Sequence, residues 1–159
     1  MKIIFVDGPA GAGKTTWAND LATGLGLPVV HMDDLYQGWD GLEAGFTRLE
    51  QLVLQPLAQG RPALFNAHDW LNPSVAGPPV WIASTNSLVV EGCGCAPRAA
   101  ASWIDTLVWL DGPWQRRLEA CLARDAGVTR EELVAWERSS RLYFAKERTS
   151  QRSDVKLVR

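Results

Sequence analysis

Short apolar runs alternate with longer segments of helical character along this chain. The runs that predict strands lie at residues 2–7, 28–31, 87–91, 106–110 and 155–158, with a weaker one at 63–67. Segments of helix length separate most of them, at about 13–23, 42–58, 113–126 and 130–149. Strands that are apolar on both faces and separated by helices indicate a parallel sheet of about five strands with helices on both faces, a three-layer α/β fold.

Two parts of the pattern are less regular. Residues 42–58 place apolar side chains at helical spacing before Gly60, but Pro56 should kink or end that helix early. The Pro- and Gly-rich residues 72–79 predict a surface loop, and residues 81–83 fit no single assignment.

The composition indicates one folded domain, residues 1–159, with 47% hydrophobic and 21% charged residues. A formal charge of −2 gives no basic excess for nucleic-acid binding, and no run approaches the roughly 20 apolar residues of a membrane helix. The chain starts with a strand rather than an export signal, and three cysteines that cannot all pair suit a reducing compartment. We therefore expect a cytoplasmic protein with no nucleic-acid or membrane partner; its oligomeric state stays open.

Residues 8–15 (GPAGAGKT) match the phosphate-binding pattern G-x-x-x-x-G-K-[ST] between a predicted strand and a predicted helix. In such a P-loop the backbone N–H groups surround phosphates, the lysine reaches the outer phosphates, and the hydroxyl after it ligates Mg²⁺. We therefore expect Mg-ATP as the cofactor. The predicted nucleotide contacts are Gly8, Gly11, Ala12, Gly13, Lys14, Thr15 and Thr16.

The second predicted strand ends in two carboxylates, Asp33 and Asp34. A carboxylate beside the P-loop can accept the proton of an attacking hydroxyl, as phosphoryl transfer to an alcohol requires. One of the two can instead cap the following segment, as aspartate often does.

Three segments together resemble the uridine kinase family: GPAGAGKTT, the Asp-x-Leu-Tyr segment at residues 33–36, and the strand end LVVEG at 88–92. That family comprises P-loop kinases that act on small-molecule alcohols, including uridine–cytidine kinases, phosphoribulokinases and bacterial pantothenate kinases. The resemblance implies that Asp33 is the general base and that Tyr36 lines the acceptor site. It also implies a place for Glu91 in the magnesium shell or near the acceptor.

Residues 65–70 are similar to a Pro-x-Tyr-Asp-Phe segment of the family, which places His68 and Trp70 at its aromatic positions. Aromatic faces there suit an acceptor with a flat ring, so we expect a nucleoside-like substrate. Trp70 and Trp39 could equally be packing residues, and His68 could be an ordinary loop histidine.

The family's lid pattern, R-L-x-R-R-x-x-R-D, is matched at its two ends by Arg117-Leu118 and Arg124-Asp125. It is not matched at Ala120 and Cys121. We therefore expect Arg117 and Arg124 to be catalytic together with Lys14 and Asp33. The lid and acceptor segments are expected within about residues 34–80 and 112–142. Residues 137–138 look like a solvated helix face.

The expected activity is transfer of the γ-phosphoryl group of Mg-ATP to a small-molecule hydroxyl. One alternative is a nucleoside monophosphate, shikimate or gluconate-type kinase, but its anionic acceptor needs arginines, and residues 34–91 contain only Arg48 and Arg61. The other is a regulatory ATPase that switches a partner interaction; a GTPase is disfavoured because the sequence lacks an N-K-x-D segment.

Overall fold

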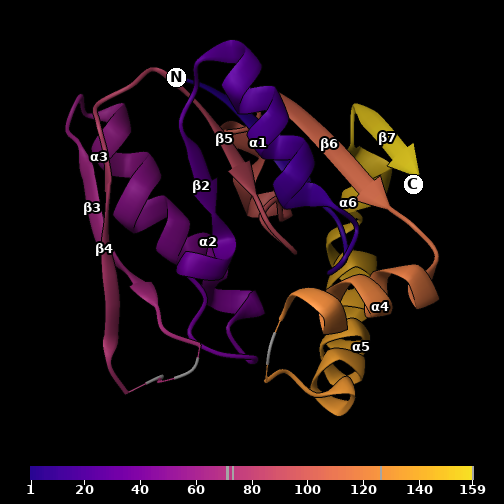
Figure 1. Ribbon diagram of the computed structural model, residues 1–159. Helices are drawn as coiled ribbons and strands as arrows, with labels where there is room; N and C mark the ends of the chain where they lie inside the picture. Colours follow the sequence, from indigo (N-terminus) through magenta and orange to yellow (C-terminus); the bar gives the residue numbers. More distant parts are fainter. Residues whose placement is uncertain (71, 73, 126, 159) are drawn as a thin grey trace.

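The computed structural model describes residues 1–70, 72, 74–125 and 127–158. Its centre is a five-stranded parallel sheet in the order β2-β5-β1-β6-β7 (Figure 1). The strands are β1 Lys2–Asp7, β2 Val29–His31, β5 Ser87–Glu91, β6 Thr106–Asp111 and β7 Val155–Val158. The predicted α/β fold with about five parallel strands is confirmed.

Alternate residues of the strands face two separate cores, as the period of two in a strand requires. Val6 and Val89 face one core, which is covered by α1 (Lys14–Leu25). Phe5 and Val90 face the larger core on the other side. That core is covered by α2 (Leu42–Leu49), α3 (Gln55–Ala58) and α5 (Arg130–Glu147). The sheet therefore lies between two helical layers.

The helix at 42–58 neither ends early nor continues as a regular α-helix. Between α2 and α3 the chain forms a π-helical segment, Glu50–Leu54, and Pro56 follows it in the first turn of α3. Proline has no N–H to donate and its ring crowds the carbonyl four residues earlier. The wider turn relieves that conflict, so Pro56 changes the helix geometry without ending the helix.

The prediction of a surface loop at residues 72–79 is wrong over its second half. Residues Ala76–Ile82 form strand β4, which pairs antiparallel with β3 (Ala63–His68) in a two-stranded ribbon outside the main sheet. Each strand of such a ribbon is an edge strand, and edge strands are where a sheet tolerates proline. Residue 73 of the expected loop lies outside the described residues.

The remaining helices lie between β6 and β7 in the chain. They are α4 (Trp114–Arg124), α5 and α6 (Thr149–Arg152), with short 3₁₀ turns at Met32–Asp34 and Arg98–Ser102. Helix α5 begins with a capping box between Thr129 and Glu132.

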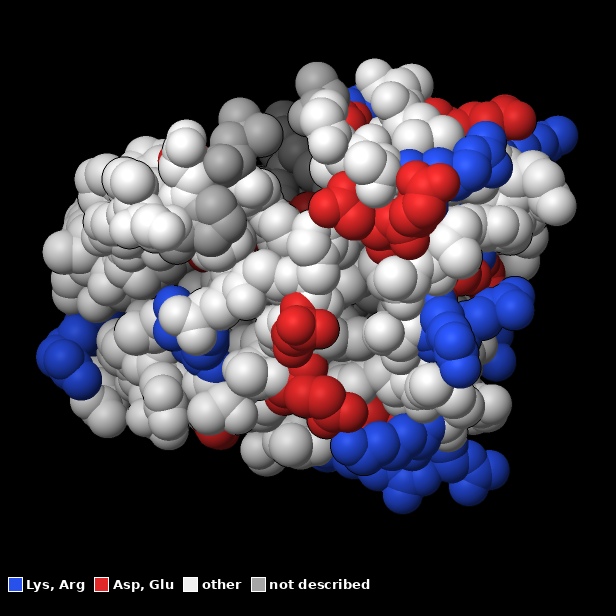
Figure 2. Space-filling model, turned by 90° about the horizontal axis from the view of Figure 1, so that it is seen from below, with Lys and Arg blue, Asp and Glu red and all other residues white. Residues whose placement is uncertain are grey.

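Seen from below, Asp and Glu atoms gather in the middle of the molecule's face, while Lys and Arg atoms lie mainly toward its edges (Figure 2). Within the described ranges, no helix is long and apolar enough to cross a membrane.

Gly8 gives a direct test of how the P-loop packs against the sheet. Its φ is +148°, and a Cβ atom there would lie 2.0 Å from the Leu110 carbonyl oxygen. We expect Gly8→Ala to lower the free energy of unfolding by about 2 kcal/mol or more, because strained backbone and a backbone clash add. Urea unfolding followed by circular dichroism measures the change.

Gly24→Ala is the matched control, since its added Cβ atom would meet no atom within 4 Å and the residue lies in helix α1. That substitution should raise stability by about 0.5–1 kcal/mol. Equal effects of the two substitutions would contradict the packing described for Gly8.

Candidate active site

The carboxyl ends of the parallel strands meet at one edge of the sheet, and a pocket of about 380 Å³ lies there. The P-loop contributes Gly11, Lys14 and Thr15 to its lining. Glu91, at the end of β5, and Asp33, just after β2, also line it. The fold therefore brings together four of the predicted site residues with the P-loop backbone.

The P-loop backbone is shaped for an anion. Gly11 and Gly13 have φ values of +74° and +82°, which favour glycine, and helix α1 begins directly afterwards at Lys14. The N–H groups of a first helical turn have no acceptor within the helix, so they can bind phosphate oxygens. The Lys14 side chain is buried, and its Nζ donates to the Pro9 carbonyl 2.9 Å away.

Ala12 and Thr16, also predicted to contact nucleotide, are not part of the pocket lining. The Ala12 side chain packs in the core beneath α1, so this residue can offer a ligand only its backbone. Thr16 is exposed and is not part of the pocket lining.

Asp7 is a buried carboxylate that the sequence indicated only as a polar residue at a strand end. Its oxygens accept hydrogen bonds from the backbone N–H groups of Gly8 at 2.7 Å, Gly94 at 2.6 Å and Ala96 at 3.0 Å. Burial raises the pKa of Asp7 to about 6, and the three N–H donors oppose the shift. Asp7 thus joins the start of the P-loop to the loop after β5.

Glu91 is held by two partners beside the P-loop. The Thr15 hydroxyl donates to Glu91 Oε1 at 3.2 Å, and His31 Nδ1 donates to the same oxygen at 2.7 Å. The hydrogen bond to Glu91 raises the pKa of His31. A hydroxyl and a carboxylate oxygen are hard ligands of the kind Mg²⁺ takes together with phosphate oxygens and water, so Thr15 and Glu91 fit the predicted metal site.

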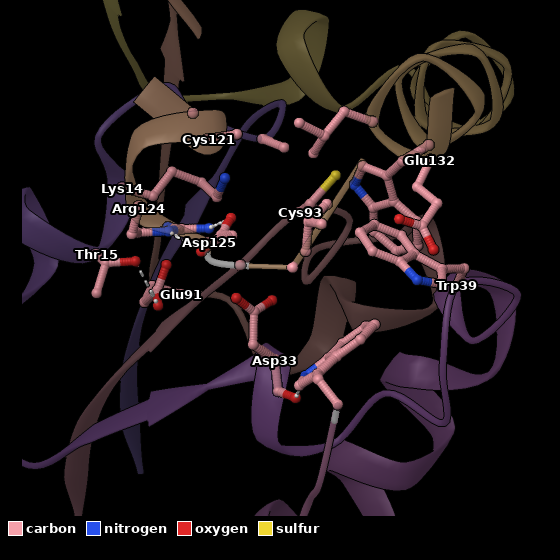
Figure 3. A pocket seen from close by; sticks show the side chains of 18 residues that line it. Lys14, Thr15, Asp33, Trp39, Glu91, Cys93, Cys121, Arg124, Asp125 and Glu132 are labelled. Carbon is pink, nitrogen blue, oxygen red and sulfur yellow. Dashed lines mark hydrogen bonds and ion pairs between the residues drawn. The ribbon is translucent and has the colours of Figure 1, made fainter. Parts of the chain in front are cut away.

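Asp33 faces the pocket from the 3₁₀ turn Met32–Asp34 (Figure 3). Solvent reaches its side chain through the pocket, but the walls displace enough water to raise its pKa. The charge of Glu91 adds to this rise, while those of Lys14 and Arg124 oppose it. A carboxylate with a raised pKa, facing a cavity near the P-loop lysine, has the properties of a general base.

The two predicted lid arginines occupy different places. Arg124 lines the pocket, where its Nε and Nη2 donate to the carboxylate of Asp125 at 2.6 and 2.8 Å. The hydrogen bond to Asp125 raises the pKa of Arg124. Arg124 can therefore bind a phosphate group in this pocket if its guanidinium releases the Asp125 carboxylate.

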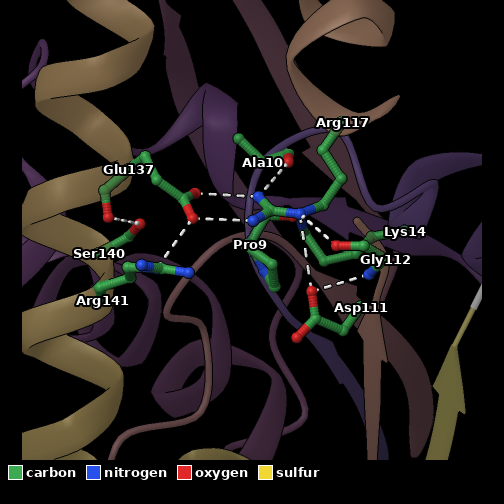
Figure 4. A network of polar contacts seen from close by, with 9 residues as sticks. All are labelled: Pro9, Ala10, Lys14, Asp111, Gly112, Arg117, Glu137, Ser140 and Arg141. Atoms are coloured by element: carbon green, nitrogen blue, oxygen red, sulfur yellow. Dashed lines mark hydrogen bonds and ion pairs between the residues drawn. The ribbon is translucent and has the colours of Figure 1, made fainter. Parts of the chain in front are cut away.

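Arg117 is buried behind the P-loop and is not part of this pocket's lining (Figure 4). Its guanidinium donates to both carboxylate oxygens of Glu137, at 2.9 and 2.7 Å, and to the carbonyls of Gly112 and Ala10. The expectation that Glu137 lies on a solvated helix face is wrong, because the carboxylate is buried against Arg117. In this structure Arg117 fixes the P-loop to α5 through Ala10.

Of the three aromatic residues predicted to contact substrate, only Trp70 lines the pocket. Tyr36 is fully buried, donates its hydroxyl proton to the Cys93 carbonyl and packs edge-on against Trp136. His68 is half-buried and lies edge-on to Trp70, with ring centroids 5.0 Å apart. Each of these two residues therefore packs against an indole that lines the pocket.

The lining also includes residues that were not predicted as substrate contacts, among them Trp39, Asp125, Glu132 and Trp136. Trp39 was weighed from the sequence as a packing or substrate residue, and it lines the pocket. Trp136 and Glu132 lie one turn apart on α5, a segment whose sequence looks like an ordinary amphipathic helix. No local signal distinguishes them, because α5 meets the pocket only through tertiary packing.

A second cavity, of about 430 Å³, lies on the other side of the P-loop. Pro9 of the P-loop forms one part of its wall, and the aromatic side chains of Trp109, Trp114 and Phe144 form another. Arg117 also reaches this cavity, with its guanidinium carbon 5.3 Å from the centroid of the Trp114 ring. The P-loop therefore separates two cavities.

Solved kinase structures share this fold over nearly the whole chain. One, described as a possible uridine kinase from Bacillus stearothermophilus, has a TM-score of 0.69 at 19% identity, covering 98% of this chain and 88% of its own. A putative fructose transport system kinase from Silicibacter sp. TM1040 has a TM-score of 0.70 at 19% identity, covering 98% and 89%. A shikimate kinase from Bacteroides thetaiotaomicron has a TM-score of 0.55 at 18% identity, covering 99% and 85%.

No protein-family model matches the sequence, and no curated protein matches it. At sequence identities of 18–19%, the similarity to these solved structures shows the fold. The chain has the three-layer P-loop fold found in these kinases, with its P-loop and its strand ends bordering one pocket.

Proposed function

We propose that this protein is an ATP-dependent kinase that transfers the γ-phosphoryl group of Mg-ATP to a hydroxyl group of a small molecule. The observation that carries the proposal is that Lys14 and Asp33 line the same pocket. Phosphoryl transfer to an alcohol needs a cation at the outer phosphates and a base at the attacking oxygen, and this pocket has both.

The two cavities beside the P-loop suit the two ends of the nucleotide. The aromatic cavity at Trp109 and Trp114 would hold the base of ATP, and the phosphates would lie along the P-loop toward Lys14. Mg²⁺, held by Thr15 and Glu91, would neutralise charge on the phosphate oxygens.

Asp33, Lys14, Arg124 and the buried Arg117 then contribute to transfer in different ways. Asp33 takes the proton of the acceptor hydroxyl as that oxygen attacks. Lys14 and Arg124 stabilise negative charge on the transferring group. Arg117 acts indirectly, because it holds Ala10 of the P-loop in place.

The sequence alone led to the expectation of a nucleoside-like acceptor, and of the aromatic residues behind that expectation only Trp70 lines the pocket. Anionic acceptors, as in the shikimate-type or monophosphate alternative, find less support. Arg48 donates its Nε–H to the Leu35 carbonyl, and Arg61 is exposed and bonded to Gln59. Neither arginine lines the pocket, so neither can pair with a carboxylate or phosphate group of an acceptor bound there.

An ADP-release screen across nucleosides, sugars, vitamins and amino alcohols tests the proposed activity. We expect at least one hydroxyl compound to raise ADP release well above the rate without acceptor. Lys14→Ala should abolish that increase because the cation at the outer phosphates is lost, while circular dichroism should show an intact fold. A Lys14→Ala variant with undiminished transfer would refute the proposal.

Substitution of Asp33 tests the base. Asp33→Asn should lower kcat by about 10²- to 10⁴-fold and leave ATP-analogue binding nearly unchanged. The base must be ionised to act, so activity should be lost as pH falls through the raised pKa of Asp33, above the ordinary value of 3.8. Single-turnover transfer and a pH profile of kcat/KM with the best acceptor measure both effects.

Asp34→Asn is the matched control, since this neighbouring carboxylate does not line the pocket. It should retain transfer. If Asp34→Asn loses transfer and Asp33→Asn keeps it, the assignment of the base is wrong.

A further inference from the structure

Three indoles, those of Trp39, Trp70 and Trp136, form part of the pocket wall. Trp39 lies between the other two, with ring centroids 5.3 Å from Trp70 and 5.6 Å from Trp136. The interplanar angles are 65° and 74°, so the rings meet edge to face. Together they form an aromatic corner, the name we use for these three residues.

The geometry of the aromatic corner favours a rounded group over a flat one. A nucleobase is bound best between parallel aromatic faces, and rings inclined at 65° and 74° cannot both stack on one flat base. Inclined indoles instead present π surfaces from several directions, which is the arrangement that binds ammonium groups by cation–π attraction.

The charges around the aromatic corner favour a cation as well. Asp33 and Glu132 line this end of the pocket, and Figure 3 shows Lys14 and Arg124 on the opposite side from Trp39 and Glu132. Among the described residues, Lys14 and Arg124 are the cations of the lining, and the charge of Arg124 is already paired with Asp125.

The distance between base and aromatic corner limits the size of the acceptor. The Trp70 indole N–H donates to the Asp33 backbone carbonyl at 2.9 Å, so the corner begins next to the proposed base. The pocket holds about 380 Å³ and must also admit the γ-phosphoryl group. A hydroxyl at Asp33 and a cation in the corner must therefore belong to one small molecule.

We propose that the acceptor is a small amino alcohol, whose protonated amine or quaternary ammonium group is held by Trp39, Trp70 and Trp136 with Glu132 nearby. This substrate class rests on the proposed kinase function. In the reaction the acceptor oxygen forms a bond to Pγ of ATP, and the bond from Pγ to the β–γ bridging oxygen breaks. The hydroxyl proton passes to Asp33, and the bridging oxygen leaves with its electron pair on ADP.

Choline and its uncharged carbon isostere, 3,3-dimethyl-1-butanol, give the sharpest comparison of acceptors. The two differ in charge at nearly constant shape, so cation–π attraction of about 1–2 kcal/mol predicts a kcat/KM about ten-fold higher for choline. Ethanolamine against ethylene glycol, and glucosamine against glucose, extend the comparison to primary amines. Equal rates within each pair, or transfer to uridine and to none of the amines, would overturn the proposal.

Binding of a cation that cannot be phosphorylated separates this inference from the proposed function. Tetramethylammonium should change the tryptophan fluorescence on binding, and Trp39→Leu should weaken that binding about ten-fold. Trp81→Leu, at an exposed indole of β4 outside the pocket, should leave binding unchanged. Trp39→Phe, which keeps an aromatic face, should recover part of the affinity and serves if Trp39→Leu does not fold.

Glu132 allows a second matched pair. Glu132→Gln removes a charge at the pocket while its amide oxygen can still accept from Thr129, so α5 should keep its cap. It should weaken tetramethylammonium binding several-fold, whereas Glu131→Gln, which removes a charge of the same turn outside the pocket lining, should not.

The outcomes of the two measurements have distinct meanings. Cation binding without transfer to any acceptor would support the aromatic corner and refute the kinase proposal. Transfer to neutral acceptors, without tetramethylammonium binding, would support the kinase and refute the cation site. Absence of both would refute both.

Discussion

The buried carboxylate of Asp7 is the interaction on which the arrangement of the site depends. It accepts N–H groups from Gly8, at the start of the P-loop, and from Gly94 and Ala96, in the loop after β5. That second loop presents the Cys93 carbonyl to Tyr36, whose ring packs against Trp136 of the aromatic corner. The positions of the P-loop and of part of the acceptor wall therefore both depend on the Asp7 carboxylate. Its raised pKa, about 6, reflects the cost of removing that carboxylate from water.

Helix α5 makes a second connection between the two ends of the pocket. Glu137 holds Arg117, which in turn holds the P-loop carbonyl of Ala10, and the preceding residue Trp136 belongs to the aromatic corner. Glu132 lies one turn earlier at the pocket. A shift of α5 would change phosphate and acceptor contacts together. A buried ion pair such as Arg117–Glu137 is weak evidence for stability, but it fixes geometry because neither charge tolerates loss of its partner.

The sequence predicted what depends on local pattern and missed what depends on packing. The parallel sheet and the P-loop follow from apolar runs and from glycine spacing, and both are confirmed. The β3–β4 ribbon was missed in part because Pro78 and Pro79 argue against a strand unless its edge is unpaired. Glu137 was misjudged because its partner, Arg117, lies 20 residues away on another helix. Tyr36 and His68 were predicted to contact substrate, but they pack against Trp136 and Trp70, and it is these two indoles that line the pocket.

Departure from the lid pattern has an electrostatic meaning once the pocket is known. The pattern R-L-x-R-R places an arginine at the position of Cys121, and the structure puts Cys121 in the pocket lining, where its uncharged side chain packs against Leu118 and Leu133. A third cation in the lining, beside Lys14 and Arg124, would have offset the carboxylates of Asp33 and Glu132. Without it, the acceptor end of the pocket keeps an excess of negative charge beside three indoles. Cys121, one of the two residues that depart from the family pattern, thus makes the proposed positively charged acceptor the better electrostatic match for this pocket.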